Sequence, residues 1–325
     1  MIPRVSVIIV DHNSGDLLLR CIKHLTAQHY KDFETILVNN GSSSYTDTDF
    51  DQFGINISVL SPGENLGFAK GCNHGAKLAT GEWLAFLNPD AYPDPEWLDC
   101  LVQATKRHPS VDAFGSTQIM ASNPSHLDGA GDVYHILGIP YRGYFGWEKA
   151  ILPEEGEVFA ACGAAALYRA ESFKNLGGFD ERFFCYGEDV DLGFRLRITG
   201  GRTIQVPSAI VRHEGSAISG RHSEFTIYHG HRNRVWLAYK NTPFWLYWPF
   251  LPLHFAASFY LFFRLLIAGI SKPYLKGIWH GYTGLARFRK DRTVILRGRK
   301  ASYKSLIQAI EWSPLKLPRR EGRNW

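Results

Sequence analysis

The sequence predicts an α/β fold built on an open, mostly parallel β-sheet with helices on its faces. Strand-like apolar segments alternate with helical segments over residues 4–90, and each strand-like segment ends in a polar cluster. A chain of 325 residues with 45% hydrophobic residues can also bury a sizeable core. Ligands of open α/β sheets bind beyond the carboxyl ends of the strands, so we expect these polar clusters to form one site.

The first two expected elements are a strand over residues 4–10 (RVSVIIV) and a helix over residues 15–29. β-branched residues dominate the strand, and the apolar residues of the second segment recur at helical spacing. The polar run 11–14 (DHNS) between them is typical of a strand-to-helix junction. We therefore expect Asp11 to lie at the ligand-binding edge of the sheet and to contact the ligand.

The same design repeats along the chain. Strands are expected within 33–43 (FETILVNNGSS) and 57–67 (ISVLSPGENLG), and a helix over 67–81. The strand WLAFL at 83–87 is followed by the turn 88–90 (NPD). The polar residues at these strand ends are Asn39, Glu64, Asn65, Asn88 and Asp90.

Asp90 and His213 are candidate ligands of a divalent cation. A carboxylate at a strand end suits a hard cation such as Mg²⁺ or Mn²⁺. His213 ends the apolar segment AIVRHEG, where a neutral imidazole can also bind a metal. The alternatives are an ordinary Asx turn at 88–90 and a hydrogen-bonded structural histidine.

Three carboxylates, Glu188, Asp189 and Asp191, lie within four positions of the sequence. Like charges this close repel one another, which indicates a site, although one acidic residue can simply interact with a helix dipole. Apolar residues alternate over 190–198, as in a strand. The acidic first turn, the late arginines and the glycines at 200–201 are typical of a helix, and we expect a helix.

The composition changes after Asn241. Residues 244–270 contain one formal charge, Arg264, and are long enough to span a bilayer, but prolines and this arginine interrupt them. From residue 271 onward, 14 Lys and Arg stand against three Asp and Glu, a net +11, which leaves −6 for the rest of a chain of net charge +5. We expect shallow attachment to an anionic membrane surface. The alternative is a hydrophobic helix packed on the protein's own core.

Other classes of protein are disfavoured. The five cysteines form no CxxC pair, which predicts neither a zinc site nor a disulfide framework and suits a reducing compartment. The N-terminus does not resemble a signal peptide, so we expect a cytoplasmic protein. The first strand is not followed by the GxGxxG motif of nicotinamide-binding enzymes, and no nucleic-acid-binding module accompanies the basic tail.

Four segments resemble the rhamnosyltransferase-like branch of the family 2 inverting glycosyltransferases. They are ENLGFAKGCN (64–73), WLAFLNPDA (83–91), GAAALYRAESFKNLGGFDERFFCYGEDVDLGFRLRITGG (163–201) and PSAIVRHEGS (207–216). The resemblance covers roughly residues 4–240. It implies a GT-A fold, a nucleotide-sugar donor and a divalent cation, with a glycosyltransferase domain over 1–240. The composition of the remaining residues predicts a C-terminal helical, membrane-associating region over 241–325.

The resemblance also implies roles for single residues. Asp90 matches the metal-binding carboxylate of the D-x-D motif, His213 matches a second metal ligand, and Asp189 matches the general base. Glu188 and Asp191 would hold the acceptor. The donor-contacting positions are Asn39 at the base, Asn88 at the ribose or sugar, and Glu64, Asn65 and Asn73 beside the nucleotide.

The sequence therefore predicts an inverting, metal-dependent glycosyltransferase on the inner face of the cell membrane. We expect dTDP-L-rhamnose as donor and a lipid-linked or cell-surface glycan as acceptor. A UDP- or GDP-sugar donor is the close alternative. A membrane scaffold that binds nucleotide-sugars without catalysis is the alternative from another class.

Overall fold

The computed structural model describes residues 4–42, 50–215, 220 and 222–316. Eight strands follow one another across the central sheet, in the order β10 (Gly156–Glu157), β12 (Thr203–His213), β6 (Ala113–Met120), β11 (Ala165–Arg169), β4 (Trp83–Leu87), β1 (Val5–Asp11), β2 (Phe33–Asn39) and β3 (Ile57–Leu60). Two short strands, β5 (Ala91–Pro93) and β7 (Leu127–Ala130), pair with β12 and β6 respectively.

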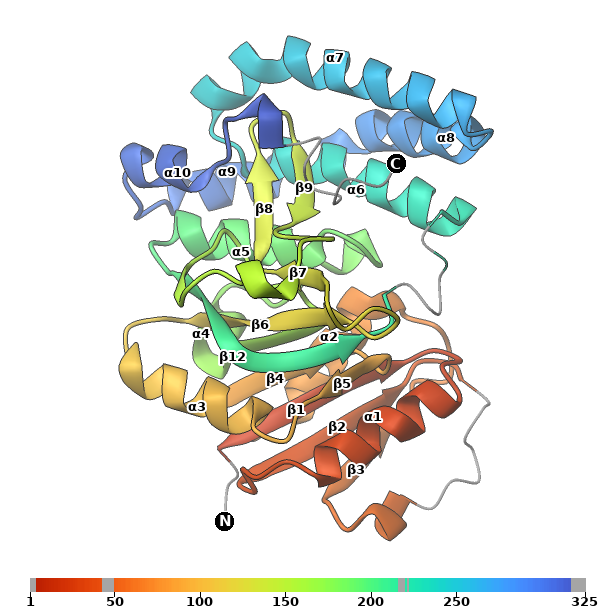
Figure 1. The fold of residues 1–325 in the computed structure, drawn as a ribbon. Coiled ribbons are helices and arrows are strands. Elements are labelled where there is room, and N and C mark those ends of the chain that lie inside the picture. The colour runs from red at the N-terminus through yellow and green to blue at the C-terminus, as the bar shows by residue number, and fades with distance from the viewer. Residues whose placement is uncertain (1–3, 43–49, 216–219, 221, 317–325) are drawn as a thin grey trace.

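The predicted α/β sheet is confirmed. β1 is parallel to both β2 and β4, β3 is parallel to β2, and β6 is parallel to β12. β11 runs antiparallel between β4 and β6, which joins the two parallel parts. Figure 1 shows this sheet across the lower half of the molecule, with helices in front of it and behind it.

Helices cover both faces of the sheet, because alternate residues of each strand point to opposite faces. Val7 and Ile9 of β1 belong to the same core as residues of α1 (Asp16–Thr26) and α3 (Trp97–Arg107). Ile8 and Val10 pack on the other face, with α2 (Gly67–Leu78). The two helices predicted from the sequence, over 15–29 and 67–81, are thus present and end three residues early.

The carboxylate-rich segment forms helix α5 (Glu188–Ile198), as predicted. It is preceded in the chain by the short helix α4 (Ala170–Asn175). All residues of α5 except Asp189 are buried, so apolar side chains are needed around the whole helix. This explains why its sequence shows no clear helical stripe and imitates the alternation of a strand.

The region 118–158 contains a hairpin. β8 (Asp132–His135) pairs antiparallel with β9 (Ile139–Arg142), apart from the main sheet. In Figure 1 the hairpin rises from β7 toward the C-terminal helices.

Helices form the C-terminal part: α6 (Glu224–Asn241), α7 (Phe244–Ile267), α8 (Ser271–Thr283), α9 (Arg289–Arg297) and α10 (Tyr303–Ala309). α6 packs on α5 toward the sheet and on α8 and α9 away from it. α7 lies across the top of the molecule, over α8 (Figure 1). The expected domain boundary after residue 240 falls at the end of α6 and stays a prediction, because α6 contacts both parts.

Candidate active site

Two cavities with a common wall lie at the carboxyl ends of the parallel strands. The sheet-edge cavity, of about 510 Å³, includes His12, Asn40, Asn65, Asp90 and His213 in its lining. The hairpin cavity, of about 380 Å³, includes Asp132, Glu188, Asp189, Arg234 and Leu261. The residues that line both are Phe68, Asn88, Arg142, Cys185 and Tyr186.

Strand pairing brings Asp90 and His213 together. β5 pairs antiparallel with the end of β12, which sets His213 opposite Ala91, the residue after Asp90. Both side chains are almost fully buried, and Nε2 of His213 lies 3.3 Å from Oδ1 of Asp90. Nδ1 of His213 forms a hydrogen bond of 2.6 Å with Oδ2 of Asp128. The imidazole therefore lies between two carboxylates.

These neighbours shift the pKa of both groups. Burial alone would lower the pKa of His213, but the hydrogen bonds to Asp128 and Asp90 outweigh it and raise the pKa to about 9. Burial would raise the pKa of Asp90, yet the hydrogen bond and charge of His213 lower it overall. The site attracts a positive charge at Nε2 of His213, which a proton or a metal ion can supply.

The donor set fits a divalent cation. A carboxylate oxygen and an imidazole nitrogen face one point, and the outer nitrogen of the imidazole is held by a carboxylate, as in many metal sites. Asn88 adds an amide oxygen, Oδ1, that is buried without a hydrogen-bond partner and lies at the wall shared by the two cavities.

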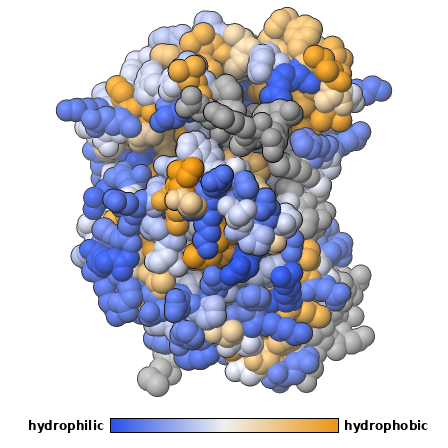
Figure 2. Space-filling view, viewed as in Figure 1, coloured by the Kyte–Doolittle hydropathy of each residue, from blue (hydrophilic) through white to orange (hydrophobic). Residues whose placement is uncertain are grey.

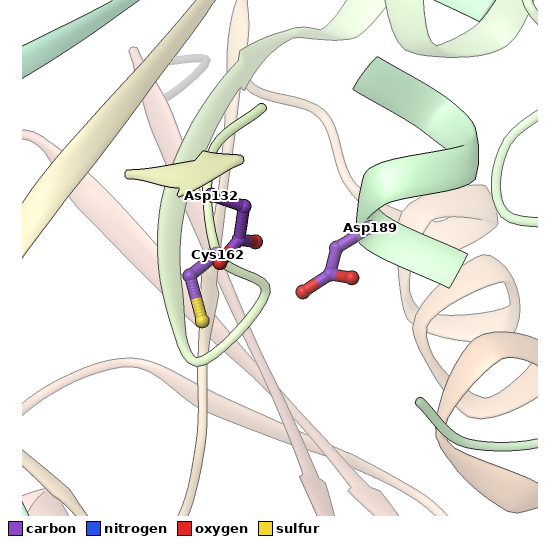
Figure 3. Close-up of side chains that lie close together, drawn as sticks. All are labelled: Asp132, Cys162 and Asp189. Carbon is purple, nitrogen blue, oxygen red and sulfur yellow. The ribbon is translucent and has the colours of Figure 1, made fainter. Parts of the chain in front are cut away.

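Asp189 faces Asp132 and Cys162 at the other side of that wall (Figure 3). A carboxylate oxygen of Asp132, the sulfur of Cys162 and a carboxylate oxygen of Asp189 all lie within 4.8 Å of one another. Oδ2 of Asp189 accepts a hydrogen bond of 2.9 Å from the backbone N–H of Gly163, and Oδ1 accepts one of 2.8 Å from that of Val190. These bonds orient the carboxylate while leaving the residue less buried than Asp132 and Glu188.

Asp132 and Glu188 are held in environments that favour protonation. Burial, the charge of Asp189 and a hydrogen bond to Asp189 raise the pKa of Asp132 well above its ordinary value. Burial and the charge of Asp189 do the same for the pKa of Glu188, whose Oε2 has no hydrogen-bond partner. Asp189 is thus the carboxylate of this group best placed to accept a proton from a ligand.

The structure corrects the role expected for Asp191. Its side chain is fully buried, and it points away from the hairpin cavity into an ion-pair network between α5 and α6. Asp191 accepts hydrogen bonds from Arg195 Nε at 2.8 Å, Lys240 Nζ at 2.9 Å and Asn241 Nδ2 at 2.8 Å. Since its oxygens accept hydrogen bonds from these three side chains, Asp191 joins α5 to α6 and does not hold an acceptor.

The residues near the first strand that we expected to contact the sugar donor differ in their surroundings. Asn65 lines the sheet-edge cavity, and its Oδ1 accepts a hydrogen bond of 3.0 Å from Nδ2 of Asn40. Glu64 beside it is exposed. Asp11 is fully buried and accepts hydrogen bonds from the backbone N–H and the hydroxyl of Ser14, so it shapes the turn after β1.

Asn39 and Asn73 use their amides inside the protein. Oδ1 of Asn39 accepts a hydrogen bond of 2.8 Å from the N–H of Ser42, three residues on, which stabilises the turn after β2. Asn73 donates to the carbonyl oxygen of Phe179 at 2.8 Å and accepts from its N–H at 2.9 Å. Donor contacts by these two residues stay predictions, and their hydrogen bonds favour structural roles.

The family model for glycosyl transferase family 2 matches residues 6–177, more than half of the chain. The chain belongs to this family. Among its relatives is N-acetylglucosaminyl-diphospho-decaprenol L-rhamnosyltransferase from Mycobacterium tuberculosis (strain ATCC 25618 / H37Rv), 30% identical over 74% of this chain and 85% of that protein. O-antigen biosynthesis protein RfbC from Myxococcus xanthus is 33% identical over 66% of this chain but 18% of that protein. The resemblance to the rhamnosyltransferase-like branch is confirmed.

Solved structures confirm the GT-A fold of this family 2 glycosyltransferase. The mannosyltransferase PcManGT from Pyrobaculum calidifontis, in complex with GDP-Man and Mn²⁺, has a TM-score of 0.56 and 18% identity over 95% of this chain and 87% of that chain. GalNAc-T7 with UDP, GalNAc and Mn²⁺ has a TM-score of 0.59 and 18% identity over 74% of this chain and 48% of that chain.

Several residues at the site of the glycosyltransferase escaped the sequence analysis. Asp132 and Arg142 lie at the two ends of the β8–β9 hairpin, and neither belongs to a motif. Arg142 forms an ion pair with Asp128, which in turn holds His213. The two acidic residues in HLDGAGD (126–132) are the signal that the sequence offers for this part of the site.

Asn233 is a further residue that the sequence did not reveal. Its side-chain amide lies 2.7–2.9 Å from the carbonyl oxygens of Phe183, Cys185 and Tyr186. These bonds hold the segment before α5 in an unusual conformation, since Phe184 and Tyr186 have φ of 66° and 74°. The strained segment forms part of the wall between the cavities.

Proposed function

We propose that this glycosyltransferase transfers L-rhamnose from dTDP-L-rhamnose, with inversion, to a hydroxyl of a lipid-linked or cell-surface glycan. The observation that carries the proposal is the position of Asp189 across a shared wall from the Asp90–His213 pair. A donor whose diphosphate lies at the pair and whose sugar lies at the wall would present its anomeric carbon to the hairpin cavity.

Asp189 acts as the general base. The acceptor hydroxyl attacks the anomeric carbon from the face opposite the nucleotide, the bond to the nucleotide diphosphate breaks, and Asp189 takes the hydroxyl proton. The backbone N–H groups of Gly163 and Val190 hold the carboxylate in place for this transfer. Burial and the charge of Asp189 raise the pKa of the neighbouring Asp132.

Asp90 and His213 hold the diphosphate end of the donor. A divalent cation, Mg²⁺ or Mn²⁺, supplies positive charge for the departing diphosphate when it is bound at these residues. Asp128 orients the imidazole of His213, and Asn88 and Arg142 offer polar groups to the sugar between the cavities. The rest of the sheet-edge cavity, with His12, Asn40 and Asn65, takes the nucleoside.

The donor is inferred from the relative in Mycobacterium tuberculosis, which is named as an L-rhamnosyltransferase. A UDP- or GDP-sugar is the second candidate, because similar solved structures contain UDP or GDP-Man. The deciding experiment measures release of nucleotide from dTDP-L-rhamnose and from UDP- and GDP-sugars, with Mg²⁺ or Mn²⁺ present. Fastest release from dTDP-L-rhamnose supports the proposal. Release from none of them, with or without a glycan acceptor, would reject transfer.

Attachment to the inner face of the cell membrane completes the proposal. α7 is long and apolar enough to cross a membrane, and 17% of its most apolar window is buried in the protein. Many of its aromatic and aliphatic side chains are exposed, including Phe259 and Ile267. Figure 2 shows apolar residues gathered at the top of the molecule, where Figure 1 places α7. We propose that this surface lies in the plane of an anionic bilayer, with the basic tail beside it.

A further inference from the structure

Arg234 is a buried cation without an acidic partner. It belongs to α6, is 5% exposed, and lines the hairpin cavity. Its Nη2 donates to the hydroxyl of Ser258 at 2.6 Å and lies 3.4 Å from that of Tyr274. Its Nε has no hydrogen-bond partner, and no carboxylate within the described ranges forms an ion pair with it.

A guanidinium stays charged at any physiological pH, so burial cannot neutralise it. Buried charges are normally paired, because removal from water is costly unless an opposite charge compensates it. Two other buried arginines follow that rule, since Arg195 forms an ion pair with Asp191 and Arg197 with Glu157. Arg292 of α9 has no ion pair within the described ranges, but it does not line this cavity. Arg234 lacks such a partner and faces a cavity, which indicates that its partner is an anionic ligand.

The cavity around Arg234 has two chemically different ends. Glu188 and Asp189 lie at one end, and Ile139, Ile227 and Leu261 form an apolar wall. The β8–β9 hairpin joins these ends, since Asp132 at its start faces Asp189 and Ile139 packs with Leu261 of α7. His254 of α7 fixes the turn of the hairpin through a 2.8 Å hydrogen bond from Nε2 to the carbonyl oxygen of Ile136.

We propose that Arg234 binds the phosphate or diphosphate of a lipid-linked acceptor, a role that rests on the proposed function. The acceptor sugar then lies between Arg234 and Asp189, and the lipid chain leaves past Leu261 along α7. A guanidinium suits this task, because its fork of donors matches phosphate oxygens. The volume of about 380 Å³ is in the range of cavities that hold small polar ligands.

Binding measurements on the full chain in detergent micelles test this proposal. The probes are farnesyl diphosphate, farnesol and inorganic pyrophosphate, which separate the contributions of the chain and the anion. We expect wild-type protein to bind farnesyl diphosphate about tenfold or more tightly than either of the others. Arg234→Gln keeps a donor for Ser258 but removes the charge, and should bind farnesyl diphosphate no better than farnesol.

Two further variants sharpen the test. Lys290→Gln removes one positive charge from the exposed surface of α9 and should leave all three affinities unchanged. Leu261→Ala should weaken farnesyl diphosphate and farnesol by the same factor, because it alters only the apolar wall. Arg234→Lys keeps a positive charge at this position but lacks the bidentate fork of the guanidinium. It should therefore retain only part of the preference for the diphosphate.

Some outcomes would overturn the proposal. Equal binding of farnesyl diphosphate by wild type and by every folded Arg234 variant would show that Arg234 holds no ligand. Pyrophosphate binding as tight as that of farnesyl diphosphate would indicate a site for free anions. These measurements need no nucleotide-sugar, so a failure to turn over any donor would reject glycosyl transfer while leaving the role of Arg234 to be judged on its own.

Discussion

Asp128 and His213 share a hydrogen bond of 2.6 Å that decides which ring nitrogen faces Asp90. With Nδ1 turned to Asp128, Nε2 is the nitrogen that lies 3.3 Å from the Asp90 carboxylate. The metal-binding role proposed for His213 therefore depends on an acidic residue from a different strand pair, β6–β7. This dependence can be measured.

Asp128→Asn should weaken binding of Mn²⁺ by about 10–100-fold, because residues that orient a metal-bound imidazole typically contribute that much. The amide can accept a hydrogen bond but carries no charge to support the imidazole. Titration of the protein with Mn²⁺, followed by electron paramagnetic resonance, measures the affinity. Asp99→Asn, at a half-buried residue of α3 outside both cavities, is the matched control. Equal affinity in both variants would contradict the assignment.

Asp90→Ala should abolish cation-dependent donor binding, and His213→Ala should weaken it. Both side chains are almost fully buried at the sheet-edge cavity, so their loss removes the oxygen and nitrogen that we propose bind the cation. Isothermal titration with the nucleotide diphosphate, with and without Mn²⁺, separates the two effects. Full activity of the wild-type enzyme in excess chelator would be inconsistent with a metal role for either residue.

Asp189→Asn should lower kcat by roughly 10²–10⁴-fold and leave donor affinity nearly unchanged, as expected for the loss of a general base. The amide oxygen can still accept one of these two hydrogen bonds, from Gly163 or from Val190, so the fold should persist. Single-turnover kinetics with saturating donor measures the chemical step. Near-normal turnover would assign the proton transfer to another group, and Asp132→Asn would be the next variant to test.

Asp191→Ala should destabilise the protein by about 3–5 kcal/mol, because it removes the carboxylate of buried Arg195 and leaves buried Lys240 with Asp180 alone. Urea unfolding at neutral pH measures the free energy. The ion pairs lower the pKa of Asp191, so its contribution is present above the ordinary pKa near 3.8 and is lost as the pH falls below it. The cost of the substitution should shrink in acid. An unchanged free energy at neutral pH would mean that this network contributes nothing.

Glu188→Gln should raise the free energy of unfolding at pH 8 by about 1–3 kcal/mol. The pKa of Glu188 is raised by burial and by Asp189, so the folded state loses stability as the pH rises above the ordinary value near 4.5. Glutamine has no proton to lose, and the gain should vanish at pH 4. Thermal unfolding at both pH values measures it. A gain of equal size in acid would point to packing instead of charge.

Replacing exposed apolar residues of α7 should release the protein from membranes. Phe259 and Phe263 are 64% and 44% exposed, and Phe259→Asp with Phe263→Asp should prevent sedimentation with anionic vesicles. Leu78→Asp on α2, at a residue of 50% exposure, is the matched control. High salt should weaken attachment of the wild type only in part, because the apolar contact resists salt. Unchanged sedimentation of the α7 variant would exclude this surface as the attachment site.

A point substitution is preferable here to a truncation after Asn241. α6 ends at that residue, and Trp236 of α6 packs with Phe288 beyond α8. Removal of the C-terminal helices would expose this core and confuse loss of attachment with loss of folding.

The sequence predicted the parts of the site that depend on neighbouring residues. Strand ends are visible as polar clusters, so the position of Asp90 after β4 followed from local pattern alone. The carboxylates of α5 were recognised as a group, but their directions were not. Asp189 and Asp191 are two residues apart and therefore lie on opposite sides of the helix. Asp189 faces the cavity, whereas Asp191 forms an ion pair with Lys240 of α6.

Other residues could not be predicted because their roles arise from distant contacts. Asp132 precedes Asp189 by 57 positions in the sequence, and the two residues meet only because the β8–β9 hairpin folds beside α5. Asn73 lies in a recognised motif, yet its amide binds the backbone of Phe179, more than a hundred residues away. Such pairings leave no periodic signal in a single sequence.

The pairing of β5 with β12 has a consequence for enzyme engineering. The pairing of β5 with β12 holds His213 opposite Ala91 in a fixed register, so the distance between Asp90 and His213 depends on both strands. A one-residue insertion in either strand would shift the register and move the two side chains apart. Asn40 and Asn65 lie on loops outside that register, joined to each other by a single side-chain hydrogen bond. Libraries meant to change the donor nucleotide should therefore vary these loops and leave the short strand β5 untouched.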